Sequence, residues 1–183
     1  ECLELPPSIP EGKRLFFYPG SSIGNFSTAG AEVFLRSVRD AMGPDGTLWI
    51  TADLDKDPAV LERAYDDELG ITAAFNRNVL NHVNRLAGTD FALPDWRHVA
   101  LYDKCEMRIE MHLEAVRAVT VRWDGGERHF AKGDRIHTEN SHKYTIESFE
   151  HLLIAAGLRP ARHWVDERNW VSFFSRVKCA WRA

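Results

Sequence analysis

The sequence has 183 residues, an apolar fraction of 44% and a formal net charge of −4. A chain of this length can bury one good hydrophobic core, and the apolar fraction is typical of a globular protein. Because there is no long basic run and no apolar stretch near 18 residues, we expect no nucleic acid and no membrane partner. Three widely spaced cysteines, Cys2, Cys105 and Cys179, argue against a disulfide framework and against a zinc site. We therefore expect a cytoplasmic protein, and a monomer.

The first predicted element is a strand over Leu15–Tyr18, a continuous apolar and aromatic run typical of a strand buried on both faces of a parallel sheet. The loop that follows, residues 19–26, then lies at the carboxyl edge of the sheet, where open α/β sheets bind ligands. Gly20 and Gly24 allow a sharp turn and a close approach of the backbone to a ligand. Asn25 can donate and accept hydrogen bonds at once, which suits the head group of an amino acid. The same pattern also fits an ordinary strand-to-helix turn with Asn25 as a cap.

The segment Gly20-Ser21-Ser22-Ile23-Gly24 also matches G-x-S-x-G, the nucleophile elbow of serine hydrolases. That motif needs a helix that begins directly at the serine. Here the next predicted helix begins later, near Ser27, and the sequence has no H-G-G segment for an oxyanion hole. A hydrolase is therefore the weaker alternative.

Next along the chain, a helix capped by Ser27 or Thr28 and running to about Met42, followed by a strand at Thr47–Thr51, completes a strand, helix, strand unit. This predicts an α/β fold of the doubly wound kind. The acidic run that begins at Asp53 resembles a calcium loop, but Pro58 and Ala64 stand where the loop needs Gly and Glu. We expect instead that Asp57 caps a helix whose first residue is Pro58.

Helical spacing continues from Pro58 to about Leu86, with a break or kink at Gly70. In a continuous helix Tyr65, Thr72 and Phe75 would share one face, although each of them alone is more typical of a core. The period then becomes two through Ile109–Ala115 and Val119–Trp123. Asp124-Gly125-Gly126 predicts a tight hairpin, and further strands end near Phe130 and Ile136, so an antiparallel lobe interrupts the α/β frame. Met111 lies on the apolar face of this lobe and is by default a core residue.

In the extended segment His137–Tyr144, Glu139 and Ser141 should point the same way. A carboxylate and a hydroxyl spaced in this way can hold an imidazole, which offers one N–H donor and one lone pair. A solvated loop is the plain alternative, and a metal site of His137, Glu139 and His142 lacks a standard spacing. The chain should end with a helix that starts at Thr145–Ser148 and stops at Gly157, and two strands, Arg162–Val165 and Trp170–Val177.

Four segments occur together and in order: Gly20–Phe26, Asp53–Glu68, Ile109–Leu113 and His137–Tyr144. The combination closely resembles the carboxyl-terminal part of the L-histidine Nα-methyltransferases of ergothioneine biosynthesis. The resemblance implies a class I (Rossmann-like) methyltransferase fold, with residues 1–55 and 144–183 in the core and 56–143 as an inserted substrate-binding lobe. It also implies transfer of up to three methyl groups from S-adenosyl-L-methionine to the α-amino group of L-histidine, giving hercynine.

The resemblance also implies roles for individual residues, carried over position by position. Substrate-binding residues would be Asn25 and Tyr65 for the carboxylate, Glu139 and Ser141 for the imidazole, Met111 and Phe75 as walls, and Thr72 as a polar contact. Gly20 and Ser21 would lie beside the cofactor. His142 stands where relatives usually have a tyrosine. The family's first strands, which hold the cofactor, would precede Pro6, so we expect this chain alone to bind the cofactor poorly and not to turn over. A non-catalytic amino-acid-binding module is the other alternative.

Overall fold

The computed structural model describes residues 3, 5–43 and 45–178. The chain forms two compact units: unit 1 contains Glu1–Lys56 and Ser141–Ala183, and unit 2 contains Asp57–Asn140. Within the described ranges no helix is both long and apolar enough to cross a membrane. Of the cysteines, Cys105 is a free, exposed thiol, and Cys2 and Cys179 lie outside the described residues.

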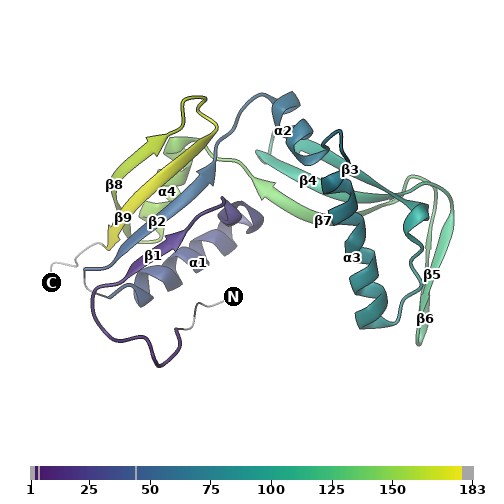
Figure 1. The fold of residues 1–183 in the computed structure, drawn as a ribbon, viewed down its shortest axis with the longest axis horizontal. Helices are drawn as coiled ribbons and strands as arrows, with labels where there is room; N and C mark the ends of the chain where they lie inside the picture. Colours follow the sequence, from purple (N-terminus) through teal and green to yellow (C-terminus); the bar gives the residue numbers. More distant parts are fainter. Residues whose placement is uncertain (1–2, 4, 44, 179–183) are drawn as a thin grey trace. The chain divides into compact units, whose positions relative to one another are not determined.

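Unit 1 is built on a four-stranded sheet whose strands lie in the order β1-β2-β9-β8 (Figure 1). The pair β1 and β2 is parallel, and the pairs β2–β9 and β9–β8 are antiparallel. The strands are β1 (Leu15–Tyr18), β2 (Thr47–Asp53), β8 (Leu158–Val165) and β9 (Val171–Lys178), and the helices are α1 (Thr28–Ala41), α4 (Ile146–Ala155) and the short 3-10 helix η1 (Ser22–Asn25). The predicted strand, helix, strand unit and the terminal helix with two strands are confirmed.

Helices α1 and α4 form one hydrophobic core with the sheet of unit 1 (Figure 1). Both helices begin where the sequence predicts. The Ser27 side chain accepts a hydrogen bond from the Gly30 N–H, and Thr145 and Ser148 form a reciprocal capping box. The core itself is made of Leu35, Val38, Leu48, Ile50, Phe149, Leu153 and Phe174, among others.

The expectation that β1 is buried on both faces is wrong. Leu15 is 58% exposed and Phe17 is 61% exposed, whereas Phe16 and Tyr18 pack against the core. The helices supply apolar contacts to one face only, and Trp49, the neighbour of Phe17 on β2, is also exposed. A continuous apolar run is typical of a strand buried on both faces, but the second face is buried only if another element packs against it.

Unit 2 combines two helices with antiparallel strands. A sheet in the order β3-β4-β7 stands beside the hairpin β5–β6 (Figure 1). The strands are β3 (Trp96–Asp103), β4 (Arg108–Ala115), β5 (Val119–Trp123), β6 (Gly126–Phe130) and β7 (Arg135–His142); the helices are α2 (Pro58–Tyr65), α3 (Ile71–Ala87) and the 3-10 helix η2 (Leu93–Asp95). Strand β7 runs on into unit 1 at Ser141.

The predicted break at Gly70 is confirmed, and one strand of unit 2 is additional to the prediction. The helical stretch from Pro58 is two helices, and Gly70 adopts a left-handed conformation (φ 69°) just before α3 begins. Asp57 caps α2 and Pro58 is its first residue, as predicted. Strand β3 was not predicted. It pairs with β4 from Trp96–Ala115 to Asp103–Arg108, and this long-range pairing, rather than a local alternation of apolar residues, makes it a strand.

Candidate functional site

The loop after β1 is tied to the carboxyl end of β2. The N–H of Ser21 donates to Thr51 Oγ1 over 2.9 Å, and Ser21 itself adopts a left-handed conformation (φ 58°). Gly20 has φ 80°, and a Cβ built there would have no neighbour closer than the Ser22 hydroxyl at 3.8 Å. The backbone at Gly20 therefore stays open to a ligand, at the sheet edge where α/β proteins bind one.

The same loop packs closely against the end of β7. A Cβ added to Gly24 would lie 2.7 Å from the His142 carbonyl oxygen and 3.6 Å from Ser141 Oγ. The His142 ring also donates from Nδ1 to the Gly24 carbonyl oxygen over 2.9 Å, which requires the proton on Nδ1. Asn25, exposed at the end of η1, thus follows directly after the residue that touches Ser141 and His142. The segments that carry two sequence-predicted site residues, Asn25 and Ser141, are far apart in the sequence and pack together here.

A buried ion pair lies behind Ser141, and the sequence analysis did not single it out. The Lys143 side chain is fully buried, and its Nζ donates to Asp53 Oδ2 and to Ser141 Oγ, both over 2.8 Å. The other oxygen of Asp53 accepts from Lys56. Backbone bonds from Tyr144 N–H to the Asp53 carbonyl (3.0 Å) and from Asp55 N–H to the Tyr144 carbonyl (2.9 Å) hold the two segments together. The sequence hint of this ion pair was that Lys143 follows Ser141 by two residues. That spacing alone does not indicate a contact, because every residue of an extended segment has a neighbour two positions away.

Unit 2 brings Tyr65 and Met111 together. Met111 is buried with Leu61 and Ile109, and the half-buried Tyr65 packs against this cluster. Tyr65 is the last residue of α2, and its carbonyl oxygen accepts from His98 Nε2 over 2.7 Å.

His98 is held in turn by helix α3. Its Nδ1 accepts from the Nδ2 of the buried Asn76 over 2.9 Å, and the same amide donates to the His112 carbonyl over 3.1 Å. With Nε2 donating to Tyr65 and Nδ1 accepting, the ring takes the neutral tautomer with its proton on Nε2. A chain of hydrogen bonds from α3 through β3 therefore fixes the end of α2 that carries Tyr65.

The remaining predicted residues of unit 2 lie on α3 and β7. Thr72 donates its N–H to Asp67 Oδ1 over 2.8 Å, and this bond is the main reason that the Asp67 pKa falls to about 2. Phe75 is 65% exposed, so it packs no core within unit 2. Glu139 is half-buried in β7, where its carbonyl oxygen accepts from His137 Nε2.

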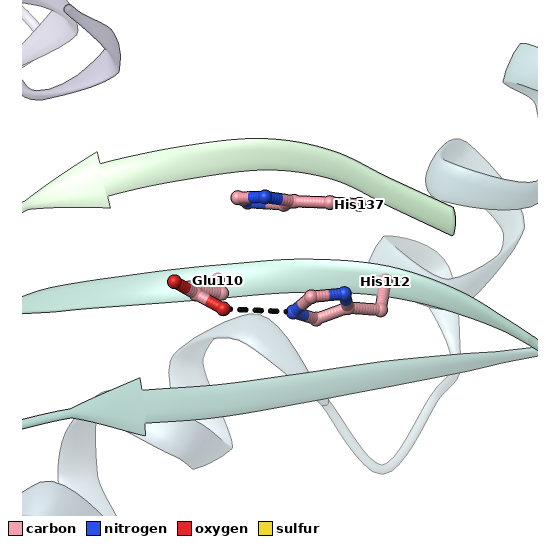
Figure 2. Close-up of side chains that lie close together, drawn as sticks. All are labelled: Glu110, His112 and His137. Atoms are coloured by element: carbon pink, nitrogen blue, oxygen red, sulfur yellow. Dashed lines mark hydrogen bonds and ion pairs between the residues drawn. The ribbon is translucent and has the colours of Figure 1, made fainter. Parts of the chain in front are cut away.

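One group of side chains in unit 2 contains possible metal ligands: Glu110 and His112 on β4 and His137 on β7 (Figure 2). Their ligand atoms lie within 4.8 Å of one another. However, His112 donates from Nε2 to Glu110 over 2.9 Å, and the two imidazole rings are stacked with centroids 4.7 Å apart and planes only 23° from parallel. The lone pairs of nearly parallel rings do not converge on one ion, so this is a hydrogen-bonded stack and not a prepared metal site.

Arg108 binds the carboxylate of this group. Its guanidinium donates to Glu110 Oε1 and is the main cause of the lowered pKa of that carboxyl. The metal alternative from the sequence, His137 with Glu139 and His142, does not form a group of converging ligand atoms among the described residues. Neither group of side chains is arranged for an ion.

Comparison with known proteins decides the family. The sequence model of the histidine-specific, SAM-dependent methyltransferase family matches residues 1–177. The chain belongs to this family. It is 44% identical over 157 residues to the histidine N-alpha-methyltransferase of Mycolicibacterium smegmatis, covering 85% of this chain and 49% of that protein. It is 41% identical over 162 residues to the protein of the same name from Mycobacterium tuberculosis, covering 87% and 50%. The chain therefore spans about half the length of these curated relatives.

A solved structure agrees with the fold. The CcbJ methyltransferase of Streptomyces caelestis superposes with a TM-score of 0.50 at 15% identity, covering 97% of this chain and 61% of that one. At this identity the likeness concerns the fold alone, and it confirms the expected α/β methyltransferase fold. The family uses S-adenosylmethionine, and the open backbone at Gly20, at the carboxyl edge of β1, fits a ligand that approaches this loop.

Proposed function

We propose that the protein carrying this chain transfers methyl groups from S-adenosyl-L-methionine to the α-amino group of L-histidine, up to three times. Membership of the histidine-specific family supports this. The structural observation that carries it is the packing of the Gly24–Asn25 loop against Ser141 and His142 at the carboxyl edge of unit 1. In the proposal, Asn25, which follows Gly24 in this loop, binds the head group of the amino acid, and Ser141 binds its ring.

In this proposal residues 56–143 act as the substrate-binding lobe. Asn25 and the Tyr65 phenol bind the carboxylate of histidine. Glu139 and Ser141 project from the same face of β7, because they are two residues apart in one strand. Glu139 accepts the ring N–H, and Ser141 donates to the ring lone pair. Met111 and Phe75 form walls, and Thr72 adds a polar contact.

The chemistry asked of this chain is mainly orientation. S-adenosyl-L-methionine supplies the methyl group when bound, and Gly20 and Ser21 would contact it. Before transfer, the α-amino group must lose a proton so that a lone pair is available. Holding the carboxylate at one end and the ring at the other leaves the α-nitrogen as the free nucleophile. Such positioning can contribute about 7 to 11 kcal/mol to lowering a barrier.

The experiment measures binding and transfer separately. Calorimetry should show saturable binding of L-histidine, and Glu139→Gln should weaken it about 5- to 10-fold, because a neutral carboxamide accepts a weaker hydrogen bond than a carboxylate. The exposed Glu127 on β6 offers a matched control, Glu127→Gln, with unchanged affinity. Mass spectrometry of the intact protein's products should show one to three added methyl groups. Equal affinity of wild type and Glu139→Gln would remove the ring clamp from the proposal.

The hydrolase alternative gains no support. Ser21, and not Ser22, has the left-handed conformation, and the long helix α1 begins only at Thr28. Hydrolysis of a model ester that Ser22→Ala abolishes would revive it. A non-catalytic module would bind histidine with no methylated product. The cytoplasmic location and the monomeric state of the protein stay predictions from the sequence.

A further inference from the structure

We infer that His142 is a positioning residue, and that its ring sets the orientation of the peptide that carries Asn25. The inference rests on the proposed function, which assigns the Asn25 carboxamide to the carboxylate of the substrate. The family resemblance gives no role to His142, where relatives usually have a tyrosine. Both His142 and the loop that it contacts belong to unit 1.

The ring of His142 is bonded to the backbone just before Asn25. Its Nδ1 donates to the Gly24 carbonyl oxygen over 2.9 Å. A carbonyl oxygen has no proton to give, so Nδ1 must be the donor in this pair. Both the imidazolium and the neutral ring protonated on Nδ1 supply that proton, so the bond does not depend on the charge of the ring.

The bonded carbonyl belongs to the same rigid unit as Asn25. A peptide is planar, so the oxygen of Gly24 moves together with the nitrogen and the Cα of Asn25. Rotating this unit would carry the oxygen away from the ring and would turn the Asn25 side chain at the same time. The backbone of His142 also lies close, since a Cβ added to Gly24 would lie 2.7 Å from the His142 carbonyl oxygen. The ring therefore holds Asn25 in one orientation.

Other contacts hold the two ends of this loop. At its start, the Ser21 N–H donates to Thr51 Oγ1 over 2.9 Å. At its end, the ring of Phe26 stacks on Phe34 with 5.3 Å between the centroids. The bond from His142 engages the peptide between these two anchors. Losing that bond should therefore disturb the site without unfolding the loop.

His142 is itself held in place by the strand that carries it. It is the last residue of β7. Two residues later, the Tyr144 N–H donates to the Asp53 carbonyl over 3.0 Å, and the Asp55 N–H donates to the Tyr144 carbonyl over 2.9 Å. Because Nδ1 is bonded directly to Cγ, close to this anchored backbone, the donor cannot swing far from Gly24.

Asparagine and leucine give a matched pair of substitutions at this position. The amide nitrogen of asparagine is bonded to Cγ, as Nδ1 is in histidine, so His142→Asn keeps a donor in almost the same place. His142→Leu introduces a side chain of similar shape to asparagine without any donor. L-histidine affinity should stay within about twofold in His142→Asn and fall about 3- to 10-fold in His142→Leu, the range for one neutral hydrogen bond. His129→Leu, at an exposed position of β6, is the control and should bind as the wild type does.

A double-mutant cycle with Asn25→Ala shows whether His142 acts through Asn25. Calorimetry on the intact protein measures the L-histidine affinity of the two single variants and of the double variant. On the Asn25→Ala background, His142→Leu should change the affinity by less than about twofold, because the side chain that it positions is already gone. Losses that add in the double variant would overturn the inference, and so would equal affinities of His142→Asn and His142→Leu.

Histamine separates positioning from a merely structural role, because it has the imidazole and the amine of histidine but no carboxylate. Its affinity, measured by direct titration, should stay within about twofold in His142→Leu. Equal losses for histamine and L-histidine would overturn the inference. Should His142→Leu fail to fold by circular dichroism, His142→Gln takes its place in the cycle, since its amide lies one carbon farther from the backbone.

The failure of the inference and that of the proposed function give different results. If the wild type binds L-histidine and His142→Leu binds it equally well, the inference alone is wrong. If the wild type does not bind L-histidine, the proposed function fails, and the inference falls with it.

Discussion

Replacing Gly24 by alanine perturbs the contact on which the candidate site depends. The added Cβ would lie 2.7 Å from the His142 carbonyl oxygen and 3.3 Å from its backbone nitrogen. Both atoms belong to the backbone of a paired strand, so no flexible side-chain end can move away. Either the loop carrying Asn25 or the end of β7 has to shift.

The magnitude follows from the clash. Forcing extra volume into a packed site costs about 1 to 3 kcal/mol. For a chain of this size, each kcal/mol lowers the unfolding midpoint by about 2 to 4 °C, so we expect a fall of about 2 to 12 °C. Because the shift separates Asn25 from Ser141, histidine affinity should fall as well, by about 10- to 100-fold.

Thermal unfolding by circular dichroism and calorimetric titration with L-histidine measure the two effects. Gly30→Ala is the matched control: there the nearest atom to the new Cβ is the Ser27 hydroxyl at 3.2 Å, at the end of the side chain that caps α1. Its stability should change by less than about 1 kcal/mol, with histidine binding unchanged. A Gly24→Ala protein as stable and as tight-binding as the wild type would refute the idea that this close approach builds the site.

Three further outcomes are expected. Asp67→Ala should lower the unfolding midpoint of the protein at pH 7. Because the folded pKa of Asp67 is depressed to about 2, its contribution to stability is complete above the unfolded pKa near 4 and disappears as pH falls toward 2. The melting curves of wild type and variant should therefore converge near pH 2, and a constant difference would contradict the assignment. Asn76→Leu removes the amide that holds His98, and it should cost about 1 to 3 kcal/mol in the free energy of urea unfolding. It should also weaken histidine binding, because His98 then no longer holds the end of α2 that carries Tyr65. Histidine binding equal to that of the wild type would show that Tyr65 does not need this support. Phe149→Ala, at a fully buried core position, should cost about 3 to 5 kcal/mol, and a smaller loss in the denaturant midpoint would mean that the core of unit 1 collapses around the cavity.

Several elements could be predicted from the sequence because the interactions that form them are local. Ser27 and Thr145 cap helices by accepting from N–H groups three positions away, and Asp57 caps α2 by accepting from the Ala59 N–H two positions away. The hairpin at Asp124–Gly126 follows from turn chemistry. The two-residue alternation of Glu139 and Ser141 depends only on an extended backbone, and β7 provides it.

Other features were not readable, because they depend on partners that are distant in the sequence. Strand β3 becomes a strand by pairing with β4, and Leu15 and Phe17 are exposed because the helices pack on one face of the sheet only. Tyr65 is held by His98 and Asn76, and no spacing pattern links the three.

By itself, the sequence determined most of the elements other than β3, the helix caps and the residue types available for an amino-acid site, since these rest on contacts within a few positions. Only the tertiary structure decided that Gly24 lies against Ser141 and that a buried Lys143, paired with Asp53, donates to that serine. The reason is physical: excluded volume and the pairing of buried charges act between atoms close in space, whatever their separation along the chain.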